Sequence, residues 1–239
     1  GVVSPFQPAW TPTEIVSLGL GGRLTLGFDE WVEDDPANPF GIDLIIFGNA
    51  GFTDGAYPFG TVSGLFGGDG GEVWVSEDGV SWIQIPGCLA DGAWPTLGYQ
   101  DAGPYDAEPG LIPTDATLPM DPALDWSQLL GSPWDDVRSA YGHSAGGVGI
   151  DLAEVGLSRI AFVEIRVSTD AFLAPEVDAA VDVRPVVMGD LDADGQVTVD
   201  DLLILLAQWG PSTDSTTADL DQNGSVDVDD LLLLLGAWP

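Results

Sequence analysis

The sequence predicts a mainly β protein that ends in a small α-helical domain. Two observations support this fold class. Residues 1–185 contain short apolar runs separated by glycine, proline and aspartate, which is the pattern of β-strands joined by turns. Residues 189–239 contain two copies of one unit, an acidic loop followed by a leucine-rich segment with helical periodicity. We therefore expect two domains, with a boundary near "VDVRPVVMGD".

Six runs in the first domain are candidate strands, because they are rich in β-branched and aromatic residues. In chain order they are "RLTLGFDEWV" (23–32), "IDLIIFGNA" (42–50), "EVWVSEDG" (72–79), "VSWIQIP" (80–86), "SRIAFVEIRVS" (158–168) and "AAVDVRPVV" (179–187). A long segment, 86–148, is rich in proline, glycine, aspartate and tryptophan. Its aromatic residues favour a contact surface over disorder, and "DPALDWSQLL" (121–130) predicts one or two helical turns.

The third and fourth runs predict a β-hairpin. A three-residue loop at 77–79, with Gly79 in the left-handed conformation, would join the two strands. Trp74 and Trp82 then become direct cross-strand partners on one face. That face is either covered by another element or exposed as an aromatic platform for a glycan. The residues expected on the opposite, core face are Val73, Val75, Ile83 and Ile85.

The two acidic loops carry the ligand pattern of an EF-hand calcium loop, which has oxygen ligands at positions 1, 3, 5, 7, 9 and 12 and glycine at position 6. The first loop supplies Asp190, Asp192, Asp194, Gln196 through its carbonyl, Thr198 and Asp201, with Gly195 at the turn. The second, 219 − 190 = 29 residues later, supplies Asp219, Asp221, Asn223, Ser225 through its carbonyl, Asp227 and Asp230, with Gly224 at the turn. Four carboxylates in each loop repel one another without a cation, and hard oxygen ligands in this number select Ca²⁺. We expect two Ca²⁺ ions.

Each acidic loop leads directly into an amphipathic segment that predicts a short helix. The apolar stripe of the first segment is Leu202, Leu205, Leu206 and Trp209, and that of the second is Leu231, Leu234, Leu235 and Trp238. The segments before the loops are poor helix formers, so each copy is a loop followed by a helix. Because helices this short are marginal alone, we expect them to pack face to face and Ca²⁺ binding to be part of folding.

Residues 189–239 resemble a type I dockerin, the duplicated calcium module that docks secreted proteins onto cohesin domains. Aspartate at position 12 of each loop, seen here as Asp201 and Asp230, matches dockerins better than the glutamate of sensor EF-hands. In that family, loop positions 10 and 11 bear on partner choice. The residues at these positions are Val199 and Asp200 in one copy and Val228 and Asp229 in the other. Because the pairs are the same, the resemblance implies that the two halves dock interchangeably.

The first domain also carries a resemblance. Its "VWVSEDGVSW" run resembles a hairpin of discoidin-like, galactose-binding jelly rolls, which implies a jelly-roll-like β-sandwich. It is more similar to a group of bacterial secreted cell surface proteins, through "DLIIFGN" (43–49), "VSEDG" (75–79), "IDLAEVG" (150–156) and "EVDAAV" (176–181). Gly48 stands where that group has a glutamate. The residues that we consider for a further, structural cation in the sandwich are Asp43, Asn49, Asp151, Glu176 and Asp178.

Composition limits the partners. The chain has 39 acidic residues against five arginines and no lysine, a net charge of −34. Such a surface repels nucleic acid and anionic membranes and attracts cations, so we expect neither nucleic acid binding nor membrane insertion. The longest apolar runs are too short to span a bilayer. Cys88 is the single cysteine, which excludes an internal disulfide. We interpret Gly1 as the start of a mature form whose leader has been removed.

The sequence shows no phosphate loop, zinc pattern, Rossmann glycine signature or nucleophile elbow, and His143 is its one histidine. We therefore expect no enzyme. The preferred interpretation is an extracellular structural protein of a bacterium, secreted or at the cell surface. It would assemble into a layer, matrix or filament through its dockerin-like module, with itself or with a cohesin-like protein as partner. The alternative is a carbohydrate-binding module that a dockerin attaches to a polysaccharide-degrading scaffold.

Overall fold

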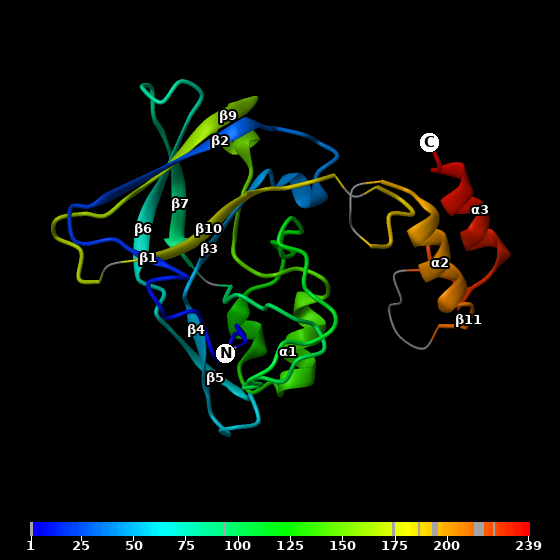
Figure 1. The fold of residues 1–239 in the computed structure, drawn as a ribbon. Helices are drawn as coiled ribbons and strands as arrows, with labels where there is room; N and C mark the ends of the chain where they lie inside the picture. The colour runs from blue at the N-terminus through cyan, green and yellow to red at the C-terminus, as the bar shows by residue number, and fades with distance from the viewer. Residues whose placement is uncertain are drawn as a thin grey trace. The chain divides into compact units, whose positions relative to one another are not determined.

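A computed structural model describes residues 2–92, 94–173, 175–185, 187–192, 196–212, 218–221 and 223–239. The chain divides into two compact units, Gly1–Val183 and Arg184–Pro239 (Figure 1). Among the described residues, no helix has the length and apolar character needed to cross a membrane.

The first unit is built from two four-stranded antiparallel sheets that share one core, as in a β-sandwich (Figure 1). One sheet has the order β1 (Val16–Ser17), β10 (Glu176–Asp182), β3 (Leu44–Gly48) and β8 (Val148–Ile150). The other has the order β2 (Arg23–Glu33), β9 (Arg159–Arg166), β6 (Gly70–Ser76) and β7 (Ile83–Asp91). Every core-lining strand supplies branched apolar side chains, which explains why these runs form strands. All six predicted runs overlap observed strands, whereas β1, β8 and the β4–β5 hairpin were not predicted.

The 86–148 segment is not one loop. It begins with the end of β7 and contains the 3₁₀ turn η2 (Trp126–Leu129) and the helix α1 (Trp134–Tyr141). Together with the hairpin of β4 (Gly51–Asp54) and β5 (Val62–Phe66), it forms a second hydrophobic core. The buried members of that core are Phe6, Phe52, Val62, Leu97, Met120, Trp134, Val137 and Tyr141. The contact-surface interpretation is therefore wrong for Trp134 and Tyr141, because they are buried within the unit.

The hairpin of β6 and β7 has a different register from the predicted one. Trp74 lies opposite Gln84, and Val75 lies opposite Ile83. The direct pairing of Trp74 with Trp82 is therefore wrong by two residues. Because the shift is even, it leaves each side chain on its predicted face. The core-face residues Val73, Val75 and Ile85 are buried, whereas Ile83 is exposed at the end of the strand.

The second unit contains two short helices, α2 (Val199–Ala207) and α3 (Val228–Gly236), and the two-residue strands β11 (Gly210–Pro211) and β12 (Ser225–Val226). Leu205 and Leu234 are fully buried in its core, and Leu202 and Leu231 are partly buried beside them. The other half of each predicted stripe is exposed: Leu206, Trp209, Leu235 and Trp238. Each predicted stripe is therefore packed only in part, because this small unit covers only one side of each helix.

Candidate metal centres

The first acidic loop brings carboxylates from its beginning and its end together. One oxygen from each of Asp190, Asp192 and Asp201 lies within 4.8 Å of the others. These residues were predicted as positions 1, 3 and 12 of a calcium loop. Two ligands on opposite sides of a Ca²⁺ ion, each at 2.3–2.6 Å, lie about 5 Å apart, so the observed spacing fits such an ion. Asp194 and Gly195 lie outside the described residues.

Asp201 connects this loop to the helix that follows. Its side chain accepts hydrogen bonds from the backbone N–H groups of Leu191 (2.6 Å), Asp192 (3.2 Å) and Thr198 (2.6 Å). The Thr198 hydroxyl in turn accepts from the Asp200 N–H, which completes a capping box at the start of α2. Burial opposes ionisation of Asp201, but the three backbone donors outweigh it and lower the pKa of the carboxyl. The group is therefore an anion ready to bind a cation.

The second acidic loop repeats this geometry. Asp219, Asp221 and Asp230 bring one oxygen each within 4.8 Å of the others. Asp230 accepts hydrogen bonds from the backbone N–H groups of Leu220 (2.7 Å), Asp221 (3.2 Å) and Asp227 (2.8 Å). Burial again opposes ionisation, and the backbone donors again lower the pKa of the Asp230 carboxyl.

The remaining predicted ligands mostly shape the loops in this structure. Thr198 and Asp227 cap the two helices through their side chains. Asn223 donates to Asp221 at 2.9 Å and accepts from the Ser225 N–H at 2.9 Å. Gln196 is predicted to bind through its backbone carbonyl, so it does not belong to the group of carboxylates.

The predicted partner residues lie on the first turn of each helix. Val199 and Val228 are 56% and 55% exposed, and the neighbouring Asp200 and Asp229 are exposed as well. Further along the same faces, the exposed leucines are Leu203 and Leu206 on α2 and Leu232 and Leu235 on α3. Together with the two valines, these leucines form one exposed apolar face on each helix, with the spacing i, i+4 and i+7. The two faces are here called the outer leucine faces, and they consist of Val199, Leu203 and Leu206 on α2 and of Val228, Leu232 and Leu235 on α3. The 29-residue period relates one face to the other.

The tryptophan side of the β6–β7 hairpin is half-buried rather than wholly covered or open. The guanidinium carbon of Arg166 lies 3.9 Å from the centroid of the Trp74 ring and 5.7 Å from that of Trp82. Arg166 is itself held by an ion pair to Glu164 at 2.5 Å. The Arg166 guanidinium therefore stacks on one face of the Trp74 ring and covers it.

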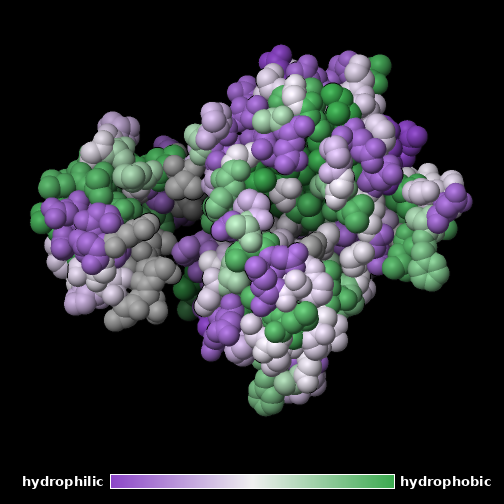
Figure 2. Space-filling view, turned by 180° about the vertical axis from the view of Figure 1, so that it is seen from behind, coloured by the Kyte–Doolittle hydropathy of each residue, from purple (hydrophilic) through white to green (hydrophobic). Residues whose placement is uncertain are grey.

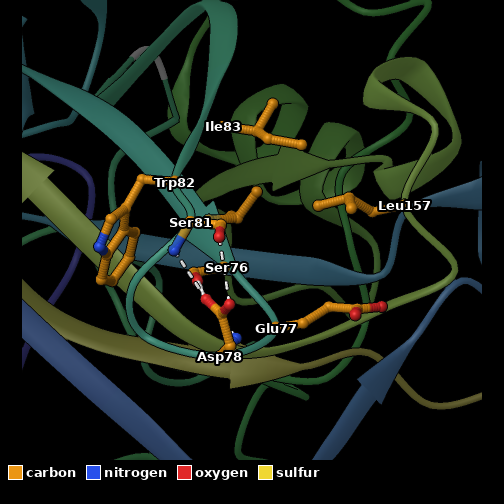
Figure 3. A pocket seen from close by; sticks show the side chains of 8 residues that line it. Ser76, Glu77, Asp78, Ser81, Trp82, Ile83 and Leu157 are labelled. Atoms are coloured by element: carbon orange, nitrogen blue, oxygen red, sulfur yellow. Dashed lines mark hydrogen bonds between the residues drawn. The ribbon is translucent and has the colours of Figure 1, made fainter.

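A hollow of about 240 Å³ lies beside the same hairpin loop (Figure 3). Its lining includes Ser76, Asp78, Ser81, Trp82 and Leu157. Asp78 accepts from the backbone N–H groups of Ser81 (2.7 Å) and Val80 (2.8 Å) and from both serine hydroxyls. These bonds, chiefly that of Ser81, lower the pKa of Asp78 to about 2. The Asp78 carboxylate therefore holds the loop in its conformation.

The five residues considered for a sandwich cation do not form one site. Asp43 and Asp151 gather with Asp34, whereas Glu176 gathers with Asp69 and Asp91. Asp178 lies in a bulge of β10 and joins neither group. Asp34, Asp69 and Asp91 were missed, and no local spacing in the sequence could have found them, because each group combines residues from distant segments.

Asp43 is a satisfied structural carboxylate. It accepts from Asp35 N–H (3.1 Å), Asn38 Nδ2 (2.9 Å) and Leu152 N–H (2.9 Å). Burial raises its pKa despite these bonds. The Asp43 carboxylate therefore has a structural role that needs no ion.

Comparison of the chain with models of known families, with curated proteins and with solved structures finds no match.

Proposed function

We propose that this protein is a non-catalytic, extracellular structural protein that assembles with further copies of itself in a Ca²⁺-dependent way, through its dockerin-like second unit. The observation that carries the proposal is the pair of outer leucine faces. Each face exposes three large apolar side chains directly after a gathered carboxylate loop. The hydrophobic residues at the surface of this unit are visible at the left of the space-filling view (Figure 2). Exposed apolar patches of this kind mark interaction sites.

Calcium controls this assembly in two ways. Bound to the loops, it fixes the direction in which each helix leaves its loop and so the position of each outer leucine face. It also reduces the repulsion between subunits, which is large at a net charge of −34. The remainder of the chain then acts as the jelly-roll-like body of the assembling unit, and secretion provides the calcium-rich surroundings that the loops require.

Two observations favour this function over the other classes. Arg166 covers the Trp74 ring, which disfavours an aromatic platform for glycans. The Nδ1 atom of the single histidine, His143, lies 2.6 Å from the Gln100 side chain, while the neighbouring Ser144 hydroxyl accepts from the Gly146 N–H. Both side chains therefore have structural partners.

The test is light scattering and electron microscopy of the full chain across a Ca²⁺ titration. We expect particles or filaments in millimolar Ca²⁺ and monomers in chelator. Leu203→Asp with Leu206→Asp on α2, or Leu232→Asp with Leu235→Asp on α3, should weaken assembly, and all four together should abolish it. Asp135→Ala on the exposed surface of α1 is the control. Wild-type protein that stays monomeric in Ca²⁺ would exclude self-assembly and leave a cohesin-like protein as the partner.

A further inference from the structure

The first unit contains a carboxylate group that joins its two sheets. Asp69 precedes β6, Asp91 ends β7 and Glu176 begins β10. One oxygen of each lies within 4.8 Å of the others. Because β7 belongs to one sheet and β10 to the other, the three side chains meet where the two sheets come together. Three carboxylates in contact carry a formal charge of −3, which is unfavourable unless something compensates it.

The protein itself compensates this charge only in part, and the Ser17 hydroxyl donates to the Glu176 carboxylate at 2.8 Å. Asp91 is 1% exposed, and within the described part of the chain its one hydrogen bond shorter than 3.4 Å comes from the Ala50 N–H, at 3.1 Å. The N–H groups of Asp69 and Glu176 point at its other oxygen from 3.4 and 3.5 Å, which is the outer limit of a hydrogen bond. Among the ion pairs of the described residues, none involves this group.

A separate observation concerns Asn49, which is 1% exposed. Neither its Oδ1 nor its Nδ2 has a hydrogen-bond partner among the residues that the structure describes, although both atoms are buried. A buried amide without partners costs about 1–3 kcal/mol by mutational measures, so such groups are rare without a ligand or water.

The residues on either side of Asn49 lie against the carboxylate group. Gly48, on one side of it, faces Asp91 so closely that a β-carbon there would overlap the carboxylate. Ala50, on the other side, donates its N–H to Asp91. A β-carbon built on Gly67 would lie 3.9 Å from Asn49 Oδ1, and the chain reaches Asp69 two residues later. Asn49 is thus enclosed by the segments that carry two of the carboxylates.

We propose that Asp69, Asp91, Glu176 and Asn49 bind one Ca²⁺ ion, which ties the two sheets of the first unit together. Three carboxylates and a neutral amide oxygen are hard ligands of the kind that Ca²⁺ takes. Oxygens that lie within 4.8 Å of one another can share one Ca²⁺ ion, because each Ca–O bond is about 2.3–2.6 Å long. The site does not depend on the proposed assembly.

The test uses the full chain with Asp190→Ala and Asp219→Ala, which disable the two loops of the second unit. Isothermal titration with CaCl₂ should still show one bound ion per chain, and Ca²⁺ should raise the unfolding temperature of the first unit. Adding Asp69→Asn or Glu176→Gln should weaken this binding at least about tenfold, because each removes a charged ligand. These two partly exposed positions are used because Asp91→Asn risks the fold.

Asp178→Asn is the matched control, since it removes the same charge from the same strand, two residues from Glu176 and outside the group. It should leave the affinity unchanged. Three outcomes would overturn the proposal: no bound ion at millimolar CaCl₂, equal weakening by the control, or binding of MgCl₂ in preference to CaCl₂. None of them concerns the outer leucine faces, so the assembly proposal stands or fails separately.

Discussion

The two kinds of carboxylate group in this molecule differ in how far apart their members lie along the chain. Asp190 and Asp201 are eleven residues apart, and the loop between them brings them together. Asp69 and Glu176 are 176 − 69 = 107 residues apart, and they meet only because β6, β7 and β10 are placed by the sheets. The carboxylates of the acidic loop, here called the local group, can therefore be recognised from their spacing in the sequence. Asp69, Asp91 and Glu176, here called the distant group, can be recognised only in the folded structure. The difference also predicts what each group depends on, namely loop hydrogen bonds in one case and packing in the other.

The largest effect is expected where packing holds the distant group. Gly48→Ala places a β-carbon against both the carboxylate and the backbone Cα of the buried Asp91, so the clash cannot be relieved by turning the Asp91 side chain alone. Overpacking of this kind should lower the free energy of unfolding of the first unit by about 3 kcal/mol. Urea denaturation followed by tryptophan fluorescence would measure it.

Gly19→Ala is the matched control, because a β-carbon built on Gly19 meets no atom within 4 Å. It should change the stability by less than about 0.5 kcal/mol. If Gly48→Ala is as stable as this control, Asp91 is free to move aside, and the distant group is not held by packing.

A smaller and local effect is expected in the second unit. Asp201→Ala removes the acceptor of three backbone N–H groups and should destabilise α2 by about 2 kcal/mol. Hydrogen exchange should then be faster over Val199–Ala207 than over Val228–Gly236, because Asp230 still holds the second loop. Asp200→Ala is the control, because Asp200 precedes Asp201 in the same helical turn and is exposed. Uniform loss of protection in both helices would show that the two copies fold as one unit.

The smallest effect concerns Asp78, a loop carboxylate that backbone donors satisfy without any cation. Its pKa lies at about 2, below the ordinary value of 3.8. Asp78 therefore stabilises the folded state above pH 4, and this contribution is lost as the pH falls towards 2. Wild-type protein should exceed Asp78→Asn in stability at pH 6, and the gap should close by pH 2. Urea titrations of both proteins at the two pH values would measure it, and a gap independent of pH would contradict the assignment.

Much of the fold could be predicted because its signals are local. All six strand-like runs contain observed strand residues, and the loop-then-helix order of residues 189–239 matches the positions of α2 and α3. The α1 helix was missed although "SPWDDVRSAYG" carries its signals: Pro133 before the first turn, Asp135 and Asp136 within it, and Gly142 after the end.

Other features could not be predicted because they depend on tertiary contacts. The hairpin register is two residues from the predicted one. The backbone N–H groups of Val80 and Ser81 donate to the Asp78 side chain, so these two residues belong to the loop and not to the strand. In the candidate sites, three carboxylates of each acidic loop gather as their spacing implied. Asp69 and Asp91 gave no signal in the sequence, because nothing in it indicates which strand ends will be neighbours.

The position of Asp201 and Asp230, each at once the end of a loop and the third residue of a helix, bears on the order in which the second unit folds. Starting a helix is its unfavourable step, because several residues must be fixed before the first hydrogen bond repays the cost. Here the closing of the loop fixes that first turn, since the same carboxylate binds the loop backbone and the N–H of the capping residue. Each copy therefore contains its own nucleation site, and we expect helix growth to begin at the loop and proceed towards Trp209 or Trp238.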